Sequence, residues 1–130
     1  MGLPDLKYFK LEEFDSSDFP GSGINMHPEF LERIDEVRHF YGKPIVITSA
    51  YRTIYKNQEV GGKLRSSHLD GLAVDVKCTN SRERFELLDA FLEVKFTRFG
   101  IGNTFLHADL SDQIEGQYSG IKTPNVIWTY

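Results

Sequence analysis

The apolar residues that follow Pro28 recur at the spacing of one buried helical face. They are Phe30, Leu31, Ile34, Val37 and Tyr41. Proline is favoured at a first helical position, Asn25 or Met26 lies near the expected cap, and Gly42 suits the end of the helix. A second helix, capped by Asn80 or Ser81, is predicted by a similar apolar pattern. Its residues are Phe85, Leu88, Phe91 and Leu92.

Four other segments have the composition or alternation of β-strands. Residues 44–51 (PIVITSAY) are β-branched, and residues 72–78 (LAVDVKC) alternate. Residues 96–102 and 104–110 meet at Gly102-Asn103, which is a hairpin signal. Residues 52–67 indicate a loop with room for one helical turn. Two helices and about four strands, with a late hairpin, predict an α+β fold.

The length of the chain predicts a single domain over residues 1–130, with an ordered N-terminal arm over residues 1–25. The arm contains turn residues in DSSDFPGSG and four apolar side chains that can pack on the body. These are Phe9, Leu11, Phe14 and Phe19.

Alternation along two of the predicted strands separates an apolar face from a polar one. The apolar faces consist of Leu72, Val74, Val76 and Cys78 in one strand, and Leu106, Ala108 and Leu110 in the other. Asp75 and His107 therefore point away from the core, and they converge if the two strands are neighbours. His68, in the polar loop of SSHLDGLAVDV, would reach the same place from outside the sheet.

Two interpretations of this cluster remain open from the sequence. His68, Asp75 and His107 are a competent zinc set, because two neutral imidazoles and one carboxylate leave a fourth position for water. The alternative is a metal-free surface with Asp75 on a solvated strand face and His107 as a partly exposed strand histidine. Cys78, the only cysteine, is expected to be a buried small hydrophobe.

Composition narrows the classes of function. The formal net charge is −4 with no basic run, so nucleic-acid binding is not expected. No apolar run approaches the roughly 18 residues of a membrane span, and the N-terminus does not have the pattern of a secretory signal. One cysteine excludes an internal disulfide and a site built on several thiolates. Any metal must rely mainly on histidine and carboxylate ligands.

The segment SSHLDGLAVD resembles the motif of the zinc D-Ala-D-Ala carboxypeptidase-like peptidases, in which a serine is followed by a histidine two residues on and an aspartate seven further. Further segments resemble the small, phage-type single-domain members in the same order. They are YFKLEEFDSSDFPGSGINM, KPIVITSAYRTIYKNQEVGG, RFGIGNTFLHAD and the closing IWTY. The resemblance covers nearly the whole chain. It implies the fold shared with the hedgehog signalling domain, a small, mostly antiparallel sheet with helices packed on one face.

The resemblance implies a role for five residues. His68, Asp75 and His107 would be the zinc ligands. Arg52 would face the substrate, either gripping a carboxylate or stabilising the oxyanion. Ser66 would hydrogen-bond substrate. The alternatives are a surface arginine after a strand and an ordinary loop serine.

One departure from the family pattern concerns the general base. Better-known relatives place a proton acceptor two or three residues before the last histidine, where this chain has Phe105 and Thr104. Asp109 is the nearest carboxylate on the same strand face, with its Cα roughly 7 Å from that of His107. It would act as the base, or it would orient a zinc histidine. Asp112, Glu115 and the N-terminal arm are further places for a base.

The expected function is therefore a zinc metallopeptidase acting on peptidoglycan stem peptides, as a D-Ala-D-Ala carboxypeptidase or an endolysin-type endopeptidase. The alternative is a non-catalytic zinc domain that binds cell-wall peptide or a protein partner. We expect a monomer made in the cytoplasm, which would reach the wall after lysis or from a phage particle.

Overall fold

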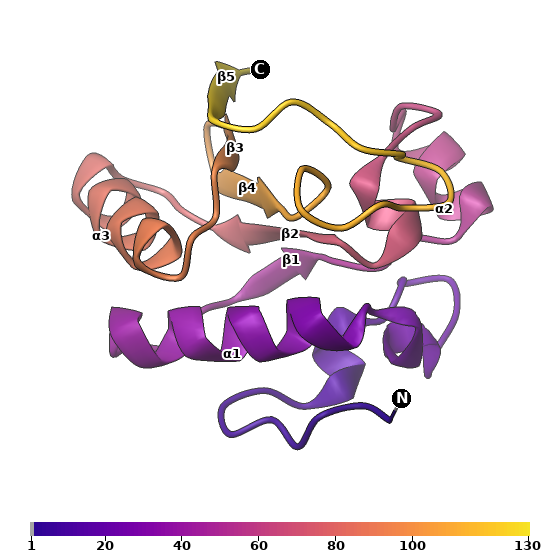
Figure 1. The fold of residues 1–130 in the computed structure, drawn as a ribbon, viewed down its shortest axis with the longest axis horizontal. Coiled ribbons are helices and arrows are strands. Elements are labelled where there is room, and N and C mark those ends of the chain that lie inside the picture. The colour runs from indigo at the N-terminus through magenta and orange to yellow at the C-terminus, as the bar shows by residue number, and fades with distance from the viewer. Residues whose placement is uncertain (1) are drawn as a thin grey trace.

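The computed structural model describes residues 2–130, so Met1, the first residue of the predicted arm, lies outside the described residues. Five strands form one sheet in the order β1-β2-β4-β3-β5 (Figure 1). They are β1 (Ile47–Ser49), β2 (Ala73–Lys77), β3 (Arg98–Ile101), β4 (Phe105–Asp109) and β5 (Val126–Thr129). Neighbouring strands are antiparallel except β3 and β5, which are parallel. The prediction of a mostly antiparallel sheet in an α+β fold is confirmed.

Two long helices, α1 (Pro28–Tyr41) and α3 (Ser81–Glu93), pack on one face of this sheet (Figure 1). The α1 helix begins after His27, whose side chain accepts a hydrogen bond from the backbone of Glu29, and it ends at Gly42 in the left-handed conformation. Asn80 caps α3, as predicted. Shorter elements complete the chain. They are α2 (Ile54–Glu59) and the 3-10 turns η1 (Leu11–Phe14), η2 (Ser22–Asn25) and η3 (Ser67–Asp70).

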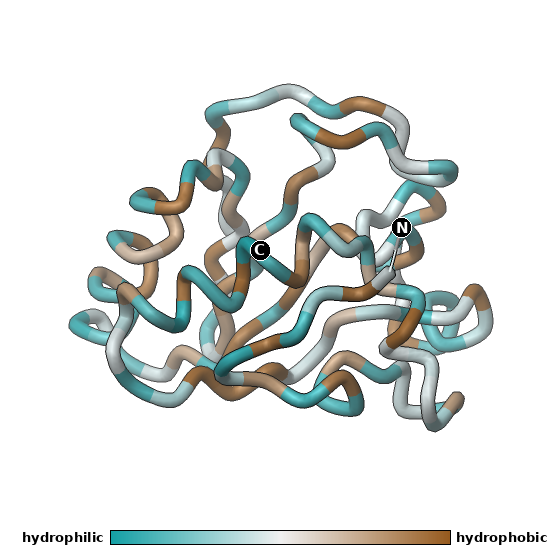
Figure 2. Tube along the Cα trace, turned by 60° about the horizontal axis from the view of Figure 1, so that its bottom comes forward, coloured by the Kyte–Doolittle hydropathy of each residue, from teal (hydrophilic) through white to brown (hydrophobic). Residues whose placement is uncertain are grey.

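The core lies between the helices and one face of the sheet. Hydrophobic and hydrophilic positions alternate along the elements (Figure 2), and the apolar side chains of β2 and β4 join those of the helices. Cys78 is fully buried in this core, as predicted. Phe9 and Phe14 also pack into it, whereas Phe19 is exposed, which corrects the expectation for that residue of the arm.

Three expectations for the elements are wrong. The buried face of α3 consists of Leu87, Ala90 and Phe91, continued by Val94, while Phe85 and Leu92 are exposed. The buried residues, at positions 87, 90, 91 and 94, have the spacing i, i+3, i+4, i+7. The apolar stripe is therefore narrower than the one predicted. The segment 44–51 pairs only at Ile47–Ser49, where an irregularity shifts the register. The short helix α2 lies where residues 52–67 left room for one helical turn, whereas the fifth strand, β5, was not predicted, because it is short.

No helix among residues 2–130 combines the length and the apolar character that a membrane crossing requires.

Candidate metal centre

One row of paired residues crosses all five strands and forms the floor of the site. The Cα partners along this row are Ser49, Asp75, His107, Gly100 and Trp128. The row faces away from the helices, because its neighbours Val74, Val76, Leu106 and Ala108 are buried in the core. The predicted convergence of Asp75 and His107 therefore follows from direct strand pairing.

His68 reaches this row from η3, the turn that precedes β2. The Ser66 hydroxyl caps the turn and accepts a hydrogen bond from the His68 backbone at 3.2 Å. Gly71 ends the turn with φ +66°, and a Cβ there would lie 2.5 Å from the carbonyl oxygen of Asn25. Only glycine fits this position without strain, so Gly71 fixes where β2 begins relative to His68.

Potential ligand atoms of the three residues lie within 4.8 Å of one another. Asp75 Oδ1 is central, at 3.3 Å from His68 Nε2 and 2.9 Å from His107 Nδ1. His68 and His107 are buried, with 3% and 7% exposure, and Asp75 is half-buried. The site is therefore enclosed by protein on most sides.

The second ring nitrogen of each histidine also has a partner. His68 Nδ1 lies 2.7 Å from the carbonyl oxygen of Ala50, which can only accept a hydrogen bond. His107 Nε2 lies 2.7 Å from Asp109 Oδ2. Each ring is therefore oriented with its remaining nitrogen toward Asp75, which is how metal-binding histidines are commonly fixed.

Burial and hydrogen bonding act in opposite directions on the charges of this cluster. Burial lowers the pKa of His68, and the nearby Asp75 only partly opposes it. Burial also disfavours a charged His107, but its bonds to Asp109 and Asp75 prevail and raise its pKa. For Asp75, burial is outweighed by hydrogen bonds from His107 and His68, which hold its pKa well below its usual range. The cluster thus keeps an ionised carboxylate at its centre.

The donor set fits zinc. Ligand atoms placed about 2.0–2.2 Å from a tetrahedral zinc lie roughly 3.4 Å apart, close to the 3.3 Å between Asp75 Oδ1 and His68 Nε2. The set consists of two imidazoles and one carboxylate, whose potential ligand atoms lie close together. Loading a metal on His107 would release the proton held between that ring and Asp75.

Arg52 lies at the β1 edge of the site and is held by three side chains. Its Nε donates to Ser49 Oγ at 3.0 Å, Nη1 to Asn57 Oδ1 at 3.3 Å and Nη2 to Asp75 Oδ2 at 3.3 Å. Burial lowers the pKa of Arg52, and the charge of Asp75 opposes that effect. The arginine therefore engages one oxygen of Asp75 while the other faces the histidines.

Asp109 is almost completely buried, with 1% exposure, and both of its oxygens are engaged. Oδ2 faces His107, while Oδ1 accepts hydrogen bonds from Arg98 Nε at 2.9 Å and from Ser111 Oγ at 2.6 Å. Burial raises the pKa of Asp109, but His107, Ser111 and Arg98 outweigh it and keep the carboxyl ionised. Of the two roles expected for Asp109, this arrangement favours orienting His107.

Apart from Asp109, the described positions considered for a base lie outside the cavity lining, except for Phe105, whose side chain cannot accept a proton. Thr104 is exposed in the hairpin, and Asp112 accepts a hydrogen bond from Thr97. The ring of Phe105 packs against Tyr130, with 5.1 Å between the ring centroids. Glu115 is exposed and also lies outside the cavity lining.

A cavity of about 730 Å³ lies above the three ligand side chains. Its lining includes the cationic side chains of Lys63, Arg98 and Lys122 and the aromatic rings of Phe105, Trp128 and Tyr130. Ser66, whose hydroxyl caps η3, also lines this cavity.

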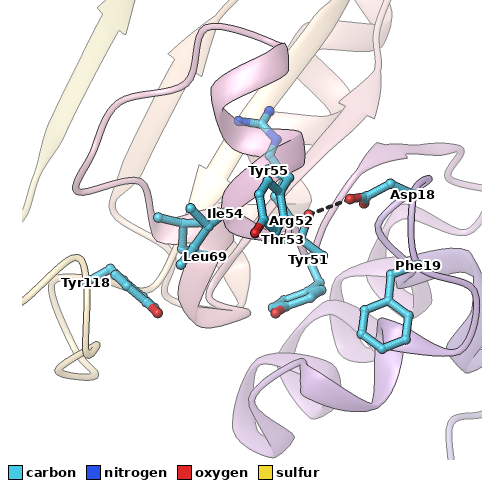
Figure 3. Close-up of a pocket in the computed structure, with 9 residues that line it drawn as sticks. All are labelled: Asp18, Phe19, Tyr51, Arg52, Thr53, Ile54, Tyr55, Leu69 and Tyr118. Atoms are coloured by element: carbon cyan, nitrogen blue, oxygen red, sulfur yellow. Dashed lines mark hydrogen bonds between the residues drawn. The ribbon is translucent and has the colours of Figure 1, made fainter.

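A second hollow of about 420 Å³ lies on the other side of the turn that carries Arg52. Rings of Phe19, Tyr51 and Tyr118 surround it, and Thr53 donates a hydrogen bond to Asp18 at 2.7 Å (Figure 3). The guanidinium of Arg52 points away from these rings (Figure 3). The positive charge of Arg52 therefore lies at the metal centre and not in this second hollow.

Several residues at the site were not predicted from the sequence. They are Ser49, Asn57, Arg98, Ser111, Lys122 and Tyr130. For Arg98 a signal existed, because alternation in FTRFGIG places it on the same face as Gly100. For Asn57 and Lys122 no local pattern distinguishes them from ordinary loop or helix residues.

We expect about one zinc per chain in the purified protein, held by the two histidines and Asp75. His68→Ala, Asp75→Ala and His107→Ala should each lose most of this zinc, because two remaining ligands bind it weakly. His39→Ala, which changes a histidine on α1 far from the site, should keep it. Metal analysis of the four variants tests the assignment, and undiminished zinc in His68→Ala or Asp75→Ala would contradict it.

Asp109→Asn should weaken zinc binding by roughly 10- to 100-fold, because His107 loses a charged acceptor that orients it. Asp112→Asn, which changes a carboxylate paired with Thr97 outside the cavity, is the matched control and should not alter it. Competition with a chelator gives both affinities. Full zinc affinity with a large loss of activity would instead assign Asp109 the role of base.

Comparison with known proteins agrees with this geometry. A family model described as Peptidase M15 matches residues 7–109, well over half of the chain, and this range includes His68, Asp75 and His107. No curated protein sequence matches the chain. A peptidase family in which the members bind zinc accounts for a buried His-Asp-His cluster beneath a cavity. The chain therefore belongs to the peptidase M15 family, the zinc D-Ala-D-Ala carboxypeptidase-like peptidases.

Proposed function

We propose that this protein is a zinc peptidase that hydrolyses peptide bonds in peptidoglycan stem peptides, as a D-Ala-D-Ala carboxypeptidase or an endolysin-type endopeptidase. The observation that carries the proposal is the convergence of His68, Asp75 and His107 beneath an open cavity, with both histidines oriented by acceptors on their far side. Membership of the M15 family supports the peptidase activity. The choice of D-Ala-containing bonds rests on the resemblance of the motif SSHLDGLAVD.

Zinc bound by these three residues would polarise the scissile carbonyl and make a water more acidic. The protein's own contribution begins with Asp75, whose ionised carboxylate offsets the positive charge of the metal. Asp109 holds His107 in place through the contact between its Oδ2 and the ring Nε2 of His107. Both carboxylates are fixed by further hydrogen bonds, so little reorganisation is needed when substrate binds.

Arg52 supplies a fixed positive charge at the edge of the cavity. Its three contacts leave the guanidinium little freedom to move. Negative charge develops on the carbonyl oxygen during peptide hydrolysis, and a rigid cation nearby stabilises it without reorganisation. We therefore assign Arg52 a role in stabilising the transition state.

Two polar atoms from β5 and the residue beyond it also lie beside His107. A Cβ on Gly100, the strand partner of His107, would lie 2.6 Å from Trp128 Nε1 and 2.7 Å from Tyr130 Oη. The absence of a side chain at Gly100 therefore lets both groups approach the site. Burial raises the pKa of Tyr130, and Trp128 partly opposes it. At neutral pH the Tyr130 hydroxyl keeps its proton and can donate a hydrogen bond to substrate.

The alternative of a non-catalytic zinc domain is favoured by one observation. The positions that carry a base in better-known relatives are Thr104 and Phe105, and Asp109 has both oxygens engaged. A domain of this kind would bind the same peptides without cleaving them.

Zinc-loaded protein should release products from purified peptidoglycan or from a stem pentapeptide, and a chelator should stop the reaction until zinc is restored. Mass spectrometry of the products identifies the bond, since loss of a single terminal D-Ala indicates a carboxypeptidase. His68→Ala should be inactive. Binding of the pentapeptide without any product would support the non-catalytic alternative.

Arg52→Ala should lower kcat/KM by roughly 10²-fold while zinc remains bound, because it removes a fixed cation from the transition state. Arg52→Lys should recover only part of the activity, since an ammonium cannot contact Ser49, Asn57 and Asp75 together. Arg82→Ala on α3 serves as the control. If thermal stability and activity of Arg52→Ala fell in proportion, the residue would be structural.

A further inference from the structure

Lys122 is a cation at the metal centre that forms no ion pair with an acidic side chain of residues 2–130. It belongs to the segment between β4 and β5, and its backbone N–H donates to the carbonyl oxygen of Ser111 at 2.9 Å. Its Nζ lies 3.3 Å from the hydroxyl of Ser67, the residue before His68. Lys122 is half-buried and lines the cavity. Its ammonium is therefore held over the site by its own stem and by one neutral hydrogen bond.

The cations that line the cavity differ in whether a carboxylate is paired with them. Arg52 pairs with Asp75, and Arg98 pairs with Asp109. Among the ion pairs of residues 2–130, none includes Lys122. Burial lowers the pKa of Lys122; Asp109 opposes this, whereas Arg98, Arg65 and Lys63 add to it. A half-buried ammonium among other cations is an unfavourable arrangement unless an anion joins it.

Arg52 is poorly placed to bind a substrate carboxylate. Each of its three nitrogens already contacts a protein side chain, and one of these contacts is to Asp75 at the metal centre. Lys122 is different, because the ammonium makes one side-chain hydrogen bond within residues 2–130, to the hydroxyl of Ser67. The two cations therefore have separate tasks.

We propose that Lys122, with the hydroxyl of Ser67, binds a carboxylate of the substrate beside the scissile bond. This inference rests on the proposed peptide substrate. It adds a specificity-determining group to the site, in a segment that the family match does not reach.

The position of Lys122 also predicts how a peptide lies in the cavity. Lys122 is anchored next to Ser111, just beyond the end of β4 at Asp109. The aromatic rings of Phe105 and Tyr130 lie toward the start of β4. His107 is between them. A peptide crossing the metal centre would place its carboxylate near Lys122 and an apolar group, such as a methyl, against the rings.

The test compares one pentapeptide, L-Ala-γ-D-Glu-L-Lys-D-Ala-D-Ala, with two versions in which a single carboxylate is converted to its amide. One version carries a C-terminal amide, and the other carries an amide on the free α-carboxyl of D-Glu. Binding to the zinc-loaded protein is followed by the first change in Trp128 fluorescence on rapid mixing, before hydrolysis accumulates. Trp128 is the only tryptophan, and it lines the cavity.

One of the two amides should bind roughly ten- to a hundredfold more weakly than the free peptide, which identifies the carboxylate that Lys122 binds. Lys122→Met should reduce affinity for the free peptide to the level of that amide, without further weakening of the amide itself. Lys122→Arg should retain part of the preference. Lys77→Met, at an exposed lysine of β2 outside the cavity lining, should behave as the wild type.

Equal binding of the acid and both amides, or equal weakening of all three peptides in Lys122→Met, would overturn the inference. So would the lack of any fluorescence change with the free peptide. The measurement does not depend on turnover. Preference for the acid without hydrolysis would leave this inference standing and reject the proposed activity, whereas hydrolysis without that preference would reject only the inference.

Discussion

The carboxylate of Asp75 is half-buried in the middle of a strand, and the rest of the site depends on compensating it. A charge removed from water is costly unless it is paired and hydrogen-bonded. Two histidines and Arg52 meet this requirement from three directions. Each of them is in turn held by a further group, namely Ala50, Asp109 or Ser49 with Asn57. Asp75, the two histidines and Arg52 thus form a small network in which each side chain has polar partners.

The two faces of the sheet have different roles, one in stability and the other in chemistry. Its helix-covered face supplies much of the core, while the row Ser49, Asp75, His107, Gly100 and Trp128 lies on the opposite face. Because side chains alternate along a strand, a slip of one residue by β2 or β4 would turn that strand's ligand toward the core and separate Asp75 from His107. The same apolar packing that stabilises the fold therefore fixes the register of the metal centre.

The part of the chain within the family match and the part beyond it contribute differently to the site. The matched family range ends at Asp109, two residues after the last proposed ligand, His107. Residues 110–130 then return over the cavity and bring Lys122, Trp128 and Tyr130 to it. The sheet would hold the metal, while a separate segment lines the cavity. In such an arrangement specificity can change without disturbing the proposed metal ligands.

The sequence by itself determined the α+β class, the α1 helix, the hairpin of β3 and β4, and the faces of Asp75 and His107, because periodicity reports which side of an element is buried. It could not determine the exposed positions of Phe85 and Phe19, the short strand β5, or the neighbours of Arg52, Asp109 and Lys122. Those features depend on contacts between segments far apart in the chain. Arg98 reaches Asp109 across a strand pair, and Lys122 reaches Ser67 across 55 residues. Only tertiary packing decides such pairs, since local spacing carries no information about which distant side chains will meet.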